Sequence, residues 1–323
     1  MGRFLLSLIG VILLGAVFLI GFGGLRALAS PRPPLRGELV DIGAGRHLRI
    51  LCQGPVSDLP LVVTESGIFG FAADWGEVQD RLAARGIRSC AYDRAGLGFS
   101  DPGPDPRDGL AVVSDLERLL RARGENGPLI LVGHSMAGLH TRLYALRNPE
   151  RVKGLVLVDA MSPLVATSGQ GRKLMDSFVG FSRSVVTMAR LGVLRAIAPF
   201  TGDSIGLPPE AHREKVWFFG SVAFNQAGAR EVQQSMRAAE QTLEAGRLSP
   251  DLPVAVVRED ANTTRGSNWG KGREQAAHDA RNGFVHAVPG ATHANLLGRK
   301  HAAVIVQAVE EVMGAAGYKP PAA

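Results

Sequence analysis

The sequence has little cysteine, few aromatic residues and no concentrated run of charge. Its 323 residues include two cysteines, Cys52 and Cys90, which excludes a disulfide-rich scaffold and a zinc site made of four thiolates. Lys and Arg number 36 against 30 Asp and Glu, but they are spread along the chain, and aromatic residues make up only 6% of it. This pattern is typical of a solvated basic surface, so we expect no nucleic-acid partner.

Cofactor motifs are also missing. The turn at residues 43–45 lacks the rest of a dinucleotide-binding fingerprint, and the sequence contains no H-E-x-x-H metal motif. We therefore expect neither a cofactor nor a metal site. Apolar sequence, in contrast, is plentiful: 46% of the residues are hydrophobic and 20% are charged, which is typical of a folded globular protein.

The N-terminal segment carries a long uncharged stretch. Residues 4–25 contain no charged side chain, and as a helix these 22 residues match the roughly 30 Å hydrocarbon core of a bilayer. We expect residues 1–29 to form a single-pass membrane anchor, followed by a Pro-rich spacer at residues 30–36. The small-x-small sequence at residues 27–29 leaves cleavage as a signal peptide open, which would release a secreted or periplasmic domain. The flanking arginines do not decide on which side of the membrane the domain lies.

After the spacer, short apolar runs alternate with helical patterns. The runs are rich in Val, Ile and Leu, as strands buried on both faces are. They occupy residues 38–43, 47–54, 60–67, 87–93, 129–135, 154–160, 253–260 and 284–290. Helical patterns lie at 75–85, 108–123, 137–148 and 302–313. This alternation predicts an α/β fold, with a mostly parallel eight-stranded sheet flanked by helices, formed by residues 37–160 and 253–317.

The interval at residues 161–252 breaks this alternation. It is too long for an ordinary crossover, and apolar residues recur in it at spacings of three and four, which predicts helix. These residues are Leu174, Phe178, Phe181, Val185 and Met188. We interpret the interval as an inserted helical cap whose apolar stripe packs on the main domain.

The apolar run that begins at residue 129 ends on a serine between small residues. Ser135 has Gly133 two positions before it and Ala137 two positions after it. Such a pattern predicts a nucleophile elbow, a sharp strand-to-helix turn where crowded backbones require small side chains. The usual G-x-S-x-G motif has glycine where this chain has Ala137, the next smallest residue. The turn also places Ser135 at a helix N-terminus, where free N–H groups favour negative charge.

Five motifs together resemble the α/β-hydrolase-fold serine hydrolases, over roughly residues 37–315. They stand in the order and at the spacing of that family: ESGIFG at 65–70, YDRAGLGFSD at 92–101, GHSMAG at 133–138, LVLVDA at 155–160 and GATHANLL at 290–297. The resemblance implies an esterase-like or lipase-like enzyme that works without a cofactor.

A serine nucleophile needs a base, and the base needs a carboxylate that fixes its tautomer. The family order of serine, acid and histidine implies that His293, on the turn after the last strand, is the base. Two positions stay open for the acid. Asp159 follows the sixth strand, as the acid does in some lipases of the fold, and Asp260 follows the seventh, as in many relatives. Glu259, beside Asp260, is a third candidate.

The resemblance also implies an oxyanion hole made of two backbone N–H groups. One belongs to Met136, directly after the nucleophile. The other is expected at Ile68, in the loop after the third strand, where relatives usually have His-Gly and this chain has residues 65–67, Glu-Ser-Gly. We expect Glu65 to make local hydrogen bonds. Arg94 is implied to belong to a tight-turn framework without a chemical role.

The family's sheet gives the two cysteines a meaning. Its second and fourth strands are neighbours, so Cys52 and Cys90 would be able to face one another. We expect either a disulfide, if the domain lies outside the cytoplasm, or two buried thiols.

The function that we expect is that of a membrane-anchored serine hydrolase acting on carboxylic esters. An apolar cap and an anchor favour an acyl or lipid-like small-molecule substrate. Epoxide hydrolases and dehalogenases of the fold would require Asp at position 135, so Ser135 argues against both. Amide or prolyl-peptide hydrolysis remains an alternative, as does a non-catalytic binding or receptor protein of the same fold.

Overall fold

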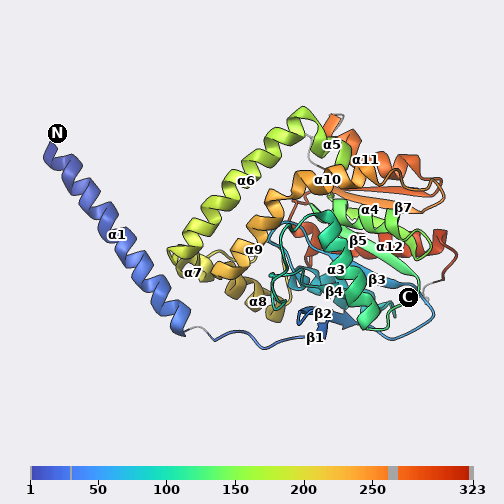
Figure 1. Ribbon diagram of the computed structural model, residues 1–323, viewed down its shortest axis with the longest axis horizontal. Helices are drawn as coiled ribbons and strands as arrows, with labels where there is room; N and C mark the ends of the chain where they lie inside the picture. The colour runs from blue at the N-terminus through green and yellow to red at the C-terminus, as the bar shows by residue number, and fades with distance from the viewer. Residues whose placement is uncertain (1, 30, 261–267, 320–323) are drawn as a thin grey trace.

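One eight-stranded β-sheet forms the centre of the computed structural model, which describes residues 2–29, 31–260 and 268–319 (Figure 1). Residues 1, 30 and 261–267, which belong to the predicted anchor, spacer and core, lie outside the described residues. The strands are β1 (Glu38–Asp41), β2 (His47–Gln53), β3 (Leu61–Glu65), β4 (Ser89–Tyr92), β5 (Leu129–His134), β6 (Val152–Val158), β7 (Val254–Glu259) and β8 (Gly283–Val288).

The strands lie in the order β1-β2-β4-β3-β5-β6-β7-β8. β2 pairs antiparallel with β1 and with β4, and the other pairings among the described strands are parallel. The predicted mostly parallel sheet is therefore confirmed. Because the chain crosses over between parallel strands, the loops after their carboxyl ends gather at one edge of the sheet, where sites in α/β folds form.

Helices cover both faces of the sheet, which explains why its central strands are continuously apolar. β5, for example, is buried along its whole length. One face packs on α2 (Gly76–Ala84) and α12 (Ala302–Ala315), and the other on α3 (Gly109–Ala122), α4 (Ala137–Arg147) and α11 (Asn268–Asp279). Short 3-10 helices, η1 (Ala72–Trp75) and η3 (Asn295–Leu297), stand in the loops after β3 and β8.

The chain between β6 and β7 forms a set of helices that we call the cap. They are α5 (Pro163–Thr167), α6 (Gly169–Arg190), α7 (Val193–Ile197), η2 (Ala198–Phe200), α8 (Pro209–Phe219), α9 (Val222–Gln233) and α10 (Ser235–Glu244). α6 contains all residues of the apolar stripe predicted from sequence, but Phe181 in that stripe is 57% exposed. The buried face is shifted toward Ser182 and Ala189, because α6 packs on α9 and small side chains let the two helices approach.

Residues Gly2–Ala29 form one helix, α1, which projects away from the sheet (blue in Figure 1). Its C-terminal part contacts the cap: Gly23 is buried against the backbone of Gly192, and a Cβ on Gly23 would overlap it. No helix within the described residues is both long and apolar enough to span a bilayer. The single-pass anchor predicted for residues 1–29 is therefore not supported. That prediction rested on the length of an uncharged stretch, and length alone does not show whether a helix packs against the protein itself.

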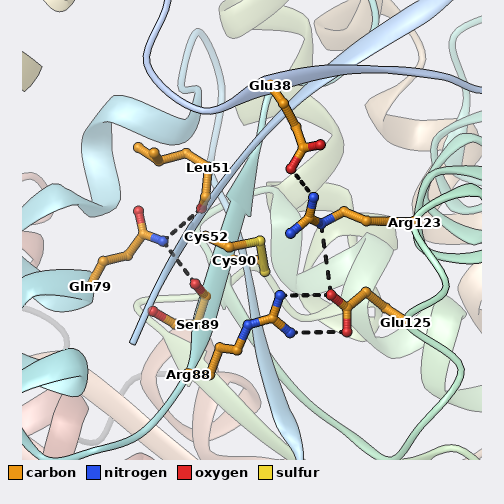
Figure 2. Close-up of a disulfide and its surroundings, with 9 residues drawn as sticks. All are labelled: Glu38, Leu51, Cys52, Gln79, Arg88, Ser89, Cys90, Arg123 and Glu125. Carbon is orange, nitrogen blue, oxygen red and sulfur yellow. Dashed lines mark hydrogen bonds and ion pairs between the residues drawn. A yellow bond between two sulfur atoms is a disulfide. The ribbon is translucent and has the colours of Figure 1, made fainter. Parts of the chain in front are cut away.

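A disulfide joins Cys52 and Cys90 (Figure 2). The two cysteines are directly paired residues on the neighbouring antiparallel strands β2 and β4, so their side chains leave the same face of the sheet. Gln79 donates hydrogen bonds across the same strand pair, to Leu51 O at 2.9 Å and Ser89 O at 3.2 Å. The structure thus contains the bond that was one of two expected states of the cysteines.

Candidate active site

Ser135 stands on the sharp turn between β5 and α4. Its φ of +56° lies in the left-handed region, and its carbonyl oxygen accepts hydrogen bonds from Gly138 N at 3.0 Å and Met161 N at 2.8 Å. Gly133 has no room for a side chain, because a Cβ there would lie 2.6 Å from Thr141 Oγ1 and 2.9 Å from Ala137 O. This close approach is the physical reason for a small residue two positions before the serine.

His293 lies in the loop after β8, and its Nδ1 forms a short hydrogen bond with Asp159 Oδ2. Asp159 directly follows β6, has a φ of +42° and is 2% exposed. Its other oxygen, Oδ1, accepts a hydrogen bond from Arg273 Nη1 of α11 at 2.6 Å. Burial raises the pKa of Asp159, but the hydrogen bond with His293 and the charge of Arg273 outweigh it, so the net pKa is lowered. Asp159 is therefore a carboxylate at neutral pH.

Asp260 lies at the end of the adjacent strand β7 and has a different partner. Its Oδ1 is 3.8 Å from Arg258 Nη1, and Arg258 also forms an ion pair with Glu274. Glu259 contributes its carbonyl oxygen to the same arginine, at 3.0 Å. Of the three carboxylates considered from the sequence, Asp159 is thus the one in contact with His293.

His134, the residue before Ser135, connects the elbow to the loop of His293. Its Nε2 donates a hydrogen bond to His293 O at 2.9 Å, and the two imidazole centroids are 4.5 Å apart. Burial, together with the nearby charge of His293, lowers the pKa of His134 to about 3, so its ring is neutral. The sequence analysis assigned no role to His134 and missed this contact, for which its position beside the serine was the only signal.

The loop after β3 approaches Ser135 from the other side. A Cβ on Gly67 would lie 2.7 Å from Ser135 Cβ and 3.2 Å from its Oγ. Ile68 packs in a small apolar cluster with Met136 and Leu139. Ile68 and Met136, the two residues expected to supply oxyanion donors, therefore pack in the same apolar cluster beside the serine turn.

Replacing Gly67 by alanine is expected to lower kcat about 10²-fold, because an added methyl group displaces the loop or the serine, and small displacements of reacting groups carry costs of that size. Steady-state hydrolysis of a p-nitrophenyl ester measures the effect. Gly127→Ala is the matched control, since a Cβ at that position meets nothing within 4 Å. Equal kcat values for the two variants would contradict a tight approach of the loop to Ser135.

Comparison with known proteins agrees with this architecture. A model of the family described as alpha/beta hydrolase fold matches residues 60–196. A solved structure of a thermophilic esterase from Thermogutta terrifontis superposes with a TM-score of 0.63 at 18% identity, covering 88% of this chain and 99% of that chain. The chain has the α/β-hydrolase fold. Its elbow, β3 loop and first cap helices all fall within the residues that the family model matches.

Curated relatives of this α/β-hydrolase-fold protein match it over its central part. A mouse sn-1-specific diacylglycerol lipase is 37% identical over 112 residues, which are 34% of this chain and 36% of the lipase. An AB hydrolase superfamily protein from Gibberella zeae is 30% identical over 128 residues, 38% of this chain and 39% of that protein. The chain thus spans well under half the length of these relatives.

Within the α/β-hydrolase fold, the candidate residues come from four loops at the carboxyl ends of β3, β5, β6 and β8. His293 is bound to a buried carboxylate on one side, while its side chain is 48% exposed. The arrangement can therefore hold an imidazole with its Nδ1 proton directed at Asp159, so that Nε2 is the nitrogen that accepts a proton. An imidazole so held is suited to general-base chemistry.

Proposed function

We propose that the protein is a serine hydrolase that cleaves carboxylic esters through an acyl-enzyme on Ser135. In this proposal His293 is the general base and Asp159 its carboxylate partner. The single observation that carries it is the contact between His293 and the buried Asp159, in a loop bound by His134 to the serine turn. A serine hydroxyl is activated when a base that a carboxylate orients comes within hydrogen-bond reach of it, which is the role proposed here for His293.

The reaction follows from these roles. Ser135 Oγ attacks the ester carbonyl carbon as its proton passes to His293 Nε2, and the N–H groups of Met136 and Ile68 stabilise the oxyanion that forms. The tetrahedral intermediate then expels the alcohol, which takes the proton from His293. Water attacks the acyl-enzyme with His293 again as the base, and collapse of the second intermediate releases the carboxylic acid and restores Ser135.

We propose acyl esters of lipid-like character as the substrate class. The oxyanion side of the site is apolar, since Ile68 and Met161 pack on Met136. The similarity to a protein named as a diacylglycerol lipase supports the same class. Esters of short and long acyl chains, compared with anilides and prolyl-peptide analogues, separate this proposal from amide hydrolysis.

Labelling with a fluorophosphonate probe tests the nucleophile. We expect stoichiometric labelling of the wild-type protein, because the probe phosphorylates an activated serine, and none of Ser135→Ala. Mass spectrometry of the labelled peptide checks the site, and heat-denatured wild-type protein is the control for non-specific reaction. Labelling of Ser135→Ala equal to that of the wild type would remove Ser135 as the nucleophile, while an unlabelled wild type would favour a binding protein of the same fold.

We also propose that the domain acts in an oxidising compartment. The support is the Cys52–Cys90 bond, because disulfides persist outside the reducing cytosol and are rare within it.

A further inference from the structure

The guanidinium group of Arg94 lies behind the loop that carries the expected oxyanion donor Ile68. Arg94 follows β4 and is 2% exposed. Its Nη1 donates a hydrogen bond to Ser66 O at 2.5 Å, and its Nη2 donates one to Gly67 O at 3.0 Å. One side chain therefore holds two successive carbonyl groups of the loop.

Holding the Gly67 carbonyl also orients the Ile68 N–H. The two groups belong to one planar trans peptide, so they point in opposite directions. With Gly67 O directed at Arg94, the Ile68 N–H is directed away from Arg94. Ser135 lies close to the same glycine, since a Cβ added to Gly67 would be 3.2 Å from its Oγ. Gly70 N also donates to Gly67 O at 3.1 Å, so this hydrogen bond and the one from Arg94 together disfavour the flipped peptide, in which a carbonyl oxygen would take the place of the donor.

The cap supplies the negative charge that keeps Arg94 in place. Glu231 of α9 is 3% exposed, and its two oxygens accept hydrogen bonds from Arg94 Nε at 3.1 Å and Nη2 at 2.8 Å. Glu65, hydrogen-bonded to His140 at 2.5 Å, lies 3.6 Å from Arg94 Nη1. A buried guanidinium needs carboxylate partners, and Glu231 is the one of these two that accepts its hydrogen bonds, so the orientation of Arg94 depends on Glu231.

Two further cap residues touch the same loop at Phe69. Lys215 Nζ of α8 donates a hydrogen bond to Phe69 O at 3.3 Å. Gly228 of α9 lies so close to the Phe69 ring that a Cβ would overlap it. Phe69 itself has a φ of +52°, which costs free energy in a residue other than glycine and requires support from its surroundings. The oxyanion loop is therefore held from the cap at several points.

We propose that Arg94 and Glu231 are positioning residues for ester hydrolysis: the cap, through Glu231, holds Arg94 on the Gly67 carbonyl and so aims the Ile68 N–H at the developing oxyanion. This inference rests on the proposed serine hydrolase function. It differs from the framework role that the sequence implied for Arg94, since a framework residue would affect stability without a specific effect on the transition state.

The test compares Glu231→Gln with Glu214→Gln. Glu214, on cap helix α8, is 1% exposed and forms a hydrogen bond of 2.9 Å with the buried Arg49 of β2. It is thus a matched buried pair between cap and core, and the hydrogen-bond partners of Glu214, Arg36 and Arg49, lie outside the oxyanion loop. Both variants are assayed with a p-nitrophenyl ester, after counting folded sites by fluorophosphonate titration. An alkylboronic acid, which forms a tetrahedral adduct with serine, provides a second measurement.

We expect Glu231→Gln to lower kcat about 10- to 100-fold at nearly unchanged KM. This loss in kcat would not exceed the loss caused by removing a whole oxyanion donor. Its affinity for the boronic acid should fall in proportion to kcat. Glu214→Gln should lose thermal stability but keep kcat per folded site. Arg94→Lys should behave like Glu231→Gln, because a single ammonium cannot hold two carbonyl groups and a carboxylate in the same geometry.

Equal kcat per folded site for Glu231→Gln and Glu214→Gln would overturn the inference and leave the hydrolase function standing. A wild-type protein that neither reacts with the fluorophosphonate nor turns over esters would overturn both. If Glu231→Gln yields no folded protein, Arg94→Lys provides the same comparison with Glu214→Gln.

Discussion

Replacing Asp159 by asparagine is expected to lower kcat for a p-nitrophenyl ester by about 10⁴-fold while the protein stays folded. The physical reason is the tautomer of His293. The carboxylate accepts the Nδ1 proton in the structure, whereas an amide can donate its own N–H to Nδ1 and leave the proton on Nε2. An imidazole protonated at Nε2 cannot accept the Ser135 proton. Steady-state kinetics measures the loss, and near-UV circular dichroism checks the fold.

Asp260→Asn is the matched control for this prediction. Both aspartates follow parallel strands at the same edge of the sheet, but Asp260 contacts Arg258. We expect Asp260→Asn to keep kcat within a factor of about two, because substitutions away from buried networks and strained sites usually have small effects. A larger loss for Asp260→Asn than for Asp159→Asn would transfer the role of acid to Asp260. Similar small losses for both would remove the carboxylate from the proposed mechanism.

Arg273 adds a second reason why Asp159 suits this role. The arginine donates to Oδ1 while His293 occupies Oδ2, so both carboxylate oxygens have a partner. This pairing favours the charged form, in agreement with the lowered pKa of the buried carboxyl group. A carboxylate that stays ionised can stabilise the imidazolium that forms during catalysis. Asp260 does not have a hydrogen-bond partner for each carboxylate oxygen, since its Oδ1 accepts no hydrogen bond within the described residues.

The sheet and the serine turn were predictable because their signals are local. Continuous apolar runs identify strands covered on both faces. The close backbone approach at Gly133 requires a small residue, which is visible in the sequence. The pairing of Cys52 with Cys90 required one more step, knowledge of which strands are neighbours, and the family resemblance supplied it. The same resemblance, through the family's order of serine, acid and histidine along the chain, implied His293 as the base.

The carboxylate that contacts His293 and the support for the loop after β3 were not predictable from local sequence. Asp159 and Asp260 end adjacent strands, and the direction of the His293 loop determines which of them it contacts. Arg273 and Glu231 lie on helices far along the chain from their partners, so no motif connects them. The N-terminal helix illustrates the same limit, because its apolar length says nothing of its contact with Gly192.

Breaking the Cys52–Cys90 bond is expected to lower the free energy of unfolding by about 3 to 4 kcal/mol, because the bond closes a 38-residue loop and restricts the unfolded chain. Stabilities of domains are of the order of 5 to 15 kcal/mol, so this is a large share. Urea unfolding of the oxidised protein, compared with the Cys52→Ala/Cys90→Ala variant, measures the loss. Mass change on alkylation, with and without reductant, establishes the state of the sulfur atoms in each sample.

The reduced wild-type protein separates the cross-link from packing. It keeps both sulfur atoms, including that of the fully buried Cys90, whereas the alanine variant also leaves a void. Other contacts hold this region: Gln79 spans the strand pair, and Arg88, next to Ser89, binds Glu125 in the loop before β5 through two hydrogen bonds of 2.8 and 3.0 Å (Figure 2). These contacts belong to the folded state and survive reduction, so we expect the reduced protein to fold with lower stability. Identical urea midpoints for the oxidised and reduced protein would show that the loop is already restricted in the unfolded chain, and would remove the stabilising role of the bond.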